Sequence, residues 1–166
     1  KTAYEILTCD WSSDVCSSDL TKMKPDQYTT LKPYKTSLKD VPKVGGLKAK
    51  DGWVNMQVQF LINEKTCNSD KLLVGWTVLP PGAQHDQHRH FNCDEFWIVI
   101  KGKGVMYGEN GEEIPSSEGD VVFTPRGHWH GFKNNSTEDV VLAWGWSGAG
   151  SLEAAGYESI EGGRTH

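Results

Sequence analysis

The alternation of hydrophobic and polar residues predicts β-strands from Trp53 onward. Within residues 53–62, every second position from Met56 to Phe60 is apolar and the positions between are polar, which is typical of a strand with one buried and one solvated face. Residues 72–79 are almost entirely apolar, as expected of a strand that is covered on both faces. Two different strand environments are therefore predicted within one short stretch of chain.

Similar short apolar segments continue to residue 146, separated by turn residues. We expect further strands around His88 and His130 and at residues 95–100, 105–108, 120–124 and 139–146. Residues 63–70 predict a polar turn, and residues 109–112 predict a hairpin, because their Asn-Gly pair favours a type I′ turn. About eight strands joined by short turns, without a long helical period, predict an all-β fold of the sandwich or barrel type.

The length of 166 residues is enough for one domain, and the parts of the chain differ in composition. We expect a foreign leader at residues 1–20, a loop-rich arm at residues 21–52, a barrel at residues 53–147 and a tail at residues 148–166. The leader resembles the translation of a sequencing-library index primer, as in genes assembled from metagenome reads, so we expect it to add nothing to the core. The arm predicts a short strand near residues 28–31. The tail predicts one helical turn at residues 151–157 or a segment packed outside the barrel.

Net charge limits the classes of possible partners, and the cysteine content indicates the cellular compartment. The formal net charge of −5 argues against nucleic acid or an anionic membrane surface as a partner, and no apolar run approaches the length of a membrane span. Outside the leader, Cys67 and Cys93 have no spacing typical of a disulfide framework, which predicts a reducing, cytoplasmic location. The foreign leader leaves open whether a secretion signal once preceded the arm.

Three histidines and a glutamate predict a metal site. His88 and His90 are two residues apart, so on a strand both imidazoles face the same side. Glu95 begins the next apolar strand, after a turn short enough to bring it beside them. His130 follows a tight Pro-x-Gly turn and can provide a fourth ligand. Nitrogen and oxygen donors that converge from neighbouring strands are ligands that divalent transition metals prefer.

The same residues form two motifs that resemble those of the cupin superfamily. The first, G-x5-H-x-H-x4-E-x6-G, runs from Gly82 to Gly102, and the second, G-x5-P-x-G-x2-H-x3-N, runs from Gly119 to Asn134. The resemblance covers roughly residues 70–147. It implies a double-stranded β-helix, also called a jelly-roll barrel, that holds one divalent metal through His88, His90, Glu95 and His130.

Strand alternation predicts which side chains line a pocket beside the metal. Trp97 and Val99 share a face with Glu95, and His128 and Phe132 share a face with His130. Further pocket candidates from neighbouring strands are Tyr107, Trp76, Trp144 and Met56. Together they predict an aromatic pocket for a small-molecule substrate that is flat or moderately apolar. We expect catalytic roles for His128, as a general base or a partner of a metal ligand, and for Tyr107. His85 is expected at the rim of the pocket or on the surface.

The expected ligand set leaves two positions open on a six-coordinate metal, where a substrate and O₂ can bind together. Iron, manganese, nickel, copper and zinc all suit such ligands. Similarity to cupin dioxygenases implies a mononuclear Fe(II) dioxygenase acting on a small carbonyl, enol or phenolic substrate. The alternative is a redox-neutral lyase, decarboxylase or isomerase, although cupin lyases of the dimethylsulfoniopropionate type carry a tyrosine where this chain has Trp97. A copper-dependent oxidative enzyme and a non-enzymatic metal-binding cupin are further alternatives.

The two most apolar segments predict that the protein assembles. Residues 72–79 and 139–146 are too apolar on both faces for a fully solvated barrel. Residues 21–62 can cover one of these faces. We therefore expect a second copy of the chain to cover the rest, in a homodimer with aligned strands across the interface.

Overall fold

The computed structural model describes residues 33–44, 52–160 and 163–164. The chain divides into two units, Lys1–Pro33 and Tyr34–His166, and every element below belongs to the second unit. The expected leader and the strand expected near residues 28–31 lie outside the described residues. No helix in the described part of the chain is long and apolar enough to cross a membrane.

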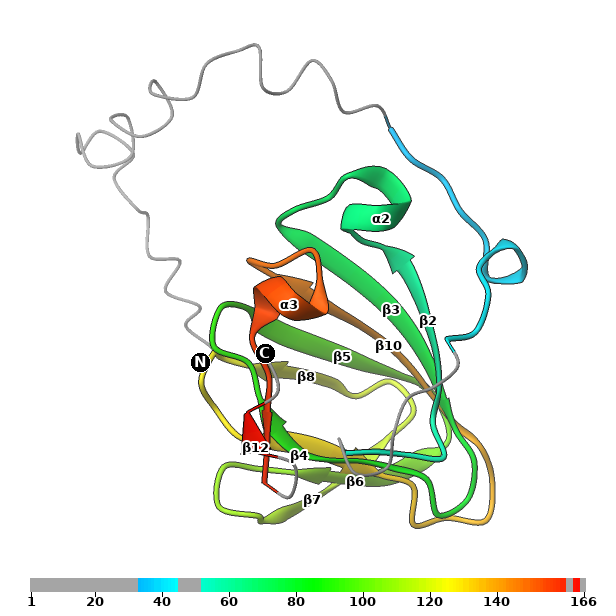
Figure 1. Ribbon diagram of the computed structural model, residues 1–166. Coiled ribbons are helices and arrows are strands. Elements are labelled where there is room, and N and C mark those ends of the chain that lie inside the picture. Colours follow the sequence, from blue (N-terminus) through cyan, green and yellow to red (C-terminus); the bar gives the residue numbers. More distant parts are fainter. Residues whose placement is uncertain (1–32, 45–51, 161–162, 165–166) are drawn as a thin grey trace, which may run out of the picture. The chain divides into compact units, whose positions relative to one another are not determined.

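Two antiparallel sheets face each other as two layers (Figure 1). One sheet has the strand order β2-β3-β10-β5-β8, with β2 at Gln57–Ile62, β3 at Leu72–Leu79, β10 at Val140–Ser147, β5 at Asp94–Lys101 and β8 at Val121–Thr124. The other has the order β12-β11-β4-β9-β6-β7, with β12 at Gly163–Arg164, β11 at Glu158–Ser159, β4 at Gln84–Arg89, β9 at His130–Lys133, β6 at Lys103–Tyr107 and β7 at Glu113–Ser117. Strand β1, at Trp53–Val54, pairs with β4. This is the all-β double-stranded β-helix that the sequence predicts.

Side chains from the inner faces of the two sheets form the core. On β3 every second residue from Leu73 to Leu79 is buried, and the residues between them are only partly covered. Trp97 on β5 and Trp146 on β10 are 4% and 2% exposed. Burying one large apolar side chain favours folding by roughly 1.5–3 kcal/mol, so this inner layer is a main source of stability.

Short segments outside the main strands differ from the expected ones for local reasons. The polar turn at residues 63–70 contains a helix, α2 at Glu64–Cys67, because Asn63 and Thr66 form a reciprocal capping box. The expected single strand at residues 53–62 breaks at Asn55, whose φ is 54°, so β1 joins the opposite sheet from β2. A one-turn 3₁₀ helix, η2, spans Leu38–Asp40.

The tail beyond β10 belongs to the barrel. It contains the expected helical turn, α3 at Leu152–Ala155, and then β11, which pairs with β4. The same segment supplies the Ala155 carbonyl, which accepts from the backbone N–H groups of Phe91 and Asn92 at 3.1 and 3.0 Å. These contacts tie the tail to the loop that carries the first sequence motif.

Candidate metal centre

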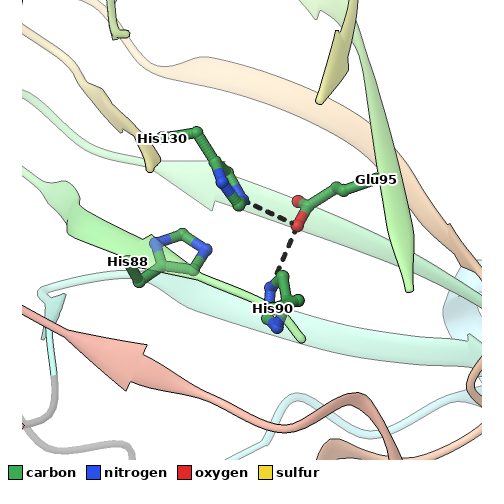
Figure 2. Close-up of side chains that lie close together, drawn as sticks. All are labelled: His88, His90, Glu95 and His130. Atoms are coloured by element: carbon green, nitrogen blue, oxygen red, sulfur yellow. Dashed lines mark hydrogen bonds and ion pairs between the residues drawn. The ribbon is translucent and has the colours of Figure 1, made fainter. Parts of the chain in front are cut away.

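Four buried side chains, three from strands and one from the loop after β4, converge between the two sheets (Figure 2). His88 lies on β4, His90 follows that strand, Glu95 lies on β5, and His130 begins β9. Their ligand atoms lie within 4.8 Å of one another, and the four side chains belong to residues no more than 7% exposed. The structure thus brings together the ligand set that the sequence predicts, as a candidate site for one divalent metal.

Each imidazole of this cluster is oriented by the backbone through its Nδ1 atom. His88, His90 and His130 donate to the carbonyls of Asp86, Gly156 and His128, at 2.8, 3.1 and 3.0 Å respectively. A carbonyl accepts only from an N–H, so each ring carries a proton on Nδ1. In the neutral ring the lone pair of Nε2 then faces the centre of the cluster.

The hydrogen-bonding pattern of this cluster fits a bound cation. Nε2 of His88 is buried without a hydrogen-bond partner among the described residues. Nε2 of His90 and Nε2 of His130 lie 3.1 and 3.0 Å from Oε2 of Glu95. Neutral rings with protonated Nδ1 would bring lone pairs against a carboxylate oxygen, and a divalent metal between them removes that repulsion. Three imidazoles and one carboxylate are also a suitable donor set for such a metal.

Two indoles hold the carboxylate of Glu95. Nε1 of Trp97 donates to Oε1 at 2.6 Å, and Nε1 of Trp146 donates to Oε2 at 2.9 Å. Burial alone raises the pKa of Glu95, but when His130 and His90 carry a second proton, their charges and hydrogen bonds outweigh burial and hold this pKa well below its usual range. Glu95 is therefore ionised at neutral pH, which is the form that binds metal.

A turn between β8 and β9 places His130 opposite the first motif. In this turn Gly127 has a φ of 82°, which favours glycine, and its N–H donates to the carbonyl of His90 at 2.6 Å. The guanidinium of Arg126 contacts both carboxylate oxygens of Asp94, at 3.1 and 3.0 Å. The turn is thereby tied to the loop that joins His90 to Glu95.

A small cavity of about 30 Å³ adjoins the cluster at Glu95. Small-molecule sites typically have roughly 300–1,000 Å³, so the lining side chains must move before a substrate can enter. Of the pocket residues that the sequence predicts, Met56, Trp97, Phe132 and Trp144 line the cavity. The other lining residues are Trp53, Thr77, Leu79, His85, Leu142 and Trp146. Among the described residues of this lining, none is lysine or arginine.

Four expected pocket or catalytic side chains are not part of the cavity lining: Trp76, Val99, Tyr107 and His128. Trp76 lies on the outer face of β3, because the alternation of that strand places Thr77 on the inner face. Val99 is buried on β5 but does not reach the cavity. Tyr107, at the end of β6, is half-buried away from the lining, and its pKa is raised by burial and by Glu113.

His128 lies outside the buried cluster. Strand β9 begins only at His130, so His128 belongs to the preceding turn and the expected alternation does not extend to it. Its side chain is 56% exposed, and its Nδ1 lies 3.1 Å from Oε2 of Glu109. Only its backbone carbonyl contacts the cluster, through His130. The expected shared face is therefore wrong, and the catalytic role of His128 stays a prediction without support from this geometry.

His85 lines the cavity although it lies three residues before His88. Strict alternation would place the two side chains on opposite faces, but β4 has a bulge between them: His85 pairs with Phe132 and His88 with His130. Three residue steps on β4 therefore match two on β9. Burial lowers the pKa of His85 to about 3, with Glu95 opposing the shift, so the ring is neutral at pH 7.

Sequence reasoning also missed Tyr157, which comes from the tail. Tyr157 is 3% exposed. Its ring centroid lies 5.2 Å from that of His88, and its hydroxyl lies 3.3 Å from Nε2 of His85. The only signal in the sequence was a single Phe, Tyr or Trp residue in residues 148–166. Trp146 was missed as well, although alternation from Trp144 on the same strand could have predicted it.

Comparison with known proteins places these residues in a wider context. Residues 75–146 match the family model described as Cupin domain. An oxalate-binding protein from Thermotoga maritima is 28% identical over 98 residues, which cover 59% of this chain and 78% of that protein. A gentisate 1,2-dioxygenase from Ralstonia sp is 33% identical over 78 residues, which cover 47% of this chain and 22% of that enzyme. The crystal structure of a predicted oxalate decarboxylase from Thermotoga maritima has a TM-score of 0.61 at 22% identity, covering 69% of this chain and 99% of that one.

Proposed function

The chain belongs to the cupin superfamily, and on this premise we propose that it is a mononuclear Fe(II) dioxygenase acting on a small carbonyl, enol or phenolic substrate. One observation carries the proposal. The buried cluster of three histidines and Glu95 shares that glutamate with an apolar, aromatic cavity. Metal and substrate can therefore meet inside the barrel, away from bulk water.

The donor count leaves room for the reaction. Three imidazole nitrogens and one carboxylate oxygen leave two positions on a six-coordinate metal. When bound, Fe(II) supplies those neighbouring positions and the electrons that activation of O₂ requires. The chain's own contribution is to hold the three Nε2 atoms and the carboxylate of Glu95 in fixed orientations.

The cavity walls favour one class of substrate. A divalent metal with one carboxylate ligand has a net charge of +1, which suits a substrate whose chelating end carries one negative charge. Trp97, Phe132 and Trp144 provide flat apolar walls for its remaining atoms. A small dianion is a poorer fit, because the described lining contains no lysine or arginine. The similarity to a dioxygenase named for an aromatic acid supports this proposal.

A redox-neutral decarboxylase, lyase or isomerase is the second candidate. The observation that favours it is the similarity to a protein named for oxalate binding, of which this chain covers 78%. In that case the metal would act as a Lewis acid and O₂ would have no part. The two candidates therefore differ in a property that can be measured directly.

The deciding experiment compares metals and oxygen. Protein loaded anaerobically with Fe(II) is tested for O₂ consumption and product with gentisate, phenolic ketones and diketones, and protein loaded with Zn(II) is the matched control. We expect O₂ uptake coupled to product only with Fe(II). Equal product formation without O₂, or with Zn(II), would replace the dioxygenase by the redox-neutral enzyme. Turnover that requires copper would indicate a copper-dependent oxidative enzyme, and metal binding without turnover a non-enzymatic protein.

We also propose that the protein forms a homodimer through the outer face of the five-stranded sheet. Edge strand β8 exposes 67% of Val121 and 66% of Phe123, which pair across to Ile98 and Phe96 on β5. Exposed hydrophobic edge strands are normally covered, and a second copy can cover this one by the same apolar surface. We expect Phe123→Lys to convert a dimer into a monomer in light scattering. A wild-type monomer at micromolar concentration would contradict the proposal.

A cytoplasmic location remains part of the proposal. The described cysteines, Cys67 and Cys93, are both free thiols, which supports a reducing compartment. Burial, followed by the charges of Glu95 and Asp94, raises the pKa of Cys93 to about 12, so this thiol is poorly reactive. Recovery of the native protein from a secreted or periplasmic fraction would contradict the location.

A further inference from the structure

We propose that His85 binds the substrate in the cavity by recognising an oxygen substituent that does not bind the metal, and that Tyr157 is the positioning residue that holds His85. The inference rests on the function proposed above, because it assumes a small substrate held beside the metal. It adds a second polar contact to a cavity whose walls are otherwise mostly apolar.

The first argument is the position of His85. Both His85 and Glu95 line the same small cavity, so a molecule that enters it by displacing lining side chains contacts the metal site and His85 at the same time. The bulge in β4 is what turns His85 inward beside His88. Bulges often re-aim side chains next to active sites, and here the re-aimed side chain is an imidazole rather than an aliphatic group.

The second argument is that the ring of His85 is held on several sides. Its centroid lies 3.8 Å from that of His88, in a stacked arrangement, and 4.4 Å from that of Trp53. The hydroxyl of Tyr157 lies 3.3 Å from Nε2 of His85. Stacking on His88 fixes the plane of the ring, and the contact with Tyr157 occupies Nε2, which leaves Nδ1 for a ligand. A side chain oriented in this way loses little entropy when it binds a ligand.

The third argument is the polar atom that remains. Within the described part of the chain, Nδ1 of His85 has no hydrogen-bond partner. Packing alone would be served by phenylalanine, which has a similar flat ring and no polar atoms to desolvate. The Tyr157 hydroxyl can donate to or accept from Nε2, so Nδ1 can offer the complementary role to a hydroxyl or carbonyl oxygen of the substrate.

The contribution of Tyr157 explains why the tail is built into the barrel. Strand β11 places Ser159 opposite His88, and the chain just before it puts Tyr157 against the rings of His85 and His88. The neighbouring Gly156 carbonyl holds His90. One short segment therefore orients both a metal ligand and the proposed substrate contact.

The test compares two ligands that differ by one hydroxyl group. Gentisate and salicylate share the carboxylate and the adjacent phenol that can chelate a metal, and gentisate alone has a further phenol. Calorimetric Kd values are measured on the full chain loaded with Zn(II), which does not support O₂-dependent turnover. The variants are His85→Phe, which keeps a stacking ring, and Tyr157→Phe, which removes only a hydroxyl. Tyr34→Phe, at a residue 43% exposed, is the matched control.

We expect wild type and Tyr34→Phe to bind gentisate about threefold to tenfold more tightly than salicylate, the range of one net hydrogen bond. In His85→Phe the ratio of the Kd for salicylate to the Kd for gentisate falls to about one, and in Tyr157→Phe it falls by at least about half. In both variants the Kd for salicylate and the zinc content stay within about twofold of wild type. His85→Gln serves as a second variant if His85→Phe does not fold.

Three outcomes would overturn the inference. They are a preference that persists in the His85 variants, an equal loss of affinity for both ligands in Tyr157→Phe, and the absence of any preference or any binding in wild type. None of these measurements involves O₂. Oxygen consumption by the Fe(II)-loaded protein therefore judges the proposed function separately.

Discussion

The metal cluster and the cavity beside it share Glu95 but are held in place by different forces. In the cluster, each imidazole is fixed by a hydrogen bond to a backbone carbonyl, and the carboxylate is fixed by two indole N–H groups. The cavity is lined mainly by aromatic and aliphatic side chains, whose positions depend on packing between the two sheets. The cluster can therefore lose its function without loss of the fold, whereas the cavity walls are part of the core.

The largest expected effect comes from removing one ligand of the cluster. His90→Ala deletes one of three nitrogen donors, so we expect the affinity for a divalent metal to fall at least about 100-fold, beyond the loss usual for supporting residues. The near-ultraviolet circular dichroism should stay native, because the cavity walls are unchanged. Metal content after dialysis, measured by mass spectrometry, checks the result. His128→Ala is the control, since this exposed histidine is expected to leave metal content unchanged. Full occupancy in His90→Ala would refute the assignment.

A smaller effect is expected where the two regions meet. Trp146→Phe removes the N–H that donates to Glu95 at 2.9 Å, and we expect roughly a 10–100-fold loss of metal affinity. Trp144→Phe is the matched control, because it makes the same change in size two residues away, where Nε1 donates to Thr77 at 2.8 Å. Both variants should lose similar stability in urea unfolding. Equal losses of metal affinity in the two variants would show that packing, and not the hydrogen bond, supports the carboxylate.

The difference between cluster and cavity also explains what the sequence could predict. The cluster depends on short spacings: the two-residue step from His88 to His90 and a tight turn before His130 fix the direction of each side chain locally. A backbone acceptor for each imidazole could be expected from the sequence, but the residue that supplies it could not. The acceptor of His90, for example, is the carbonyl of Gly156, which comes from a distant segment.

The cavity depends on features that strand alternation does not contain. A bulge in β4 turns the side chain of His85 to the inner face of the sheet. Strand β9 begins only at His130, so His128 lies in the preceding turn. Strand β3 is apolar on both faces, so its sequence does not indicate to which face Trp76 points. Tyr157 reaches the site only through the pairing of β11 with β4, a contact between segments far apart in the chain. These errors arise where tertiary structure, and not local pattern, decides the direction of a side chain.

The smallest expected effect concerns the ion pair between Arg126 and Asp94, which is exposed where the cluster is buried. Hydrogen bonds from Arg126 hold the pKa of Asp94 below its usual value, but the two side chains are 55% and 30% exposed. Solvent screens such a pair, so we expect Asp94→Asn to lower the free energy of unfolding by less than about 1 kcal/mol at neutral pH. Metal affinity should stay within about twofold of wild type, unlike that of Trp146→Phe.

The sign of the pH dependence follows from the direction of the shift. Because the pKa of Asp94 is lower in the folded protein than in the unfolded chain, the ionised side chain stabilises the fold above its unfolded pKa, and this contribution is lost as the pH falls through the folded pKa. The difference in stability between wild type and Asp94→Asn should therefore be present at pH 7 and disappear in strong acid. Urea unfolding of both proteins across this pH range measures it. A difference that grows on acidification would contradict the assignment, and a loss of metal affinity as large as that of Trp146→Phe would mean that this exposed turn, and not burial, governs the cluster.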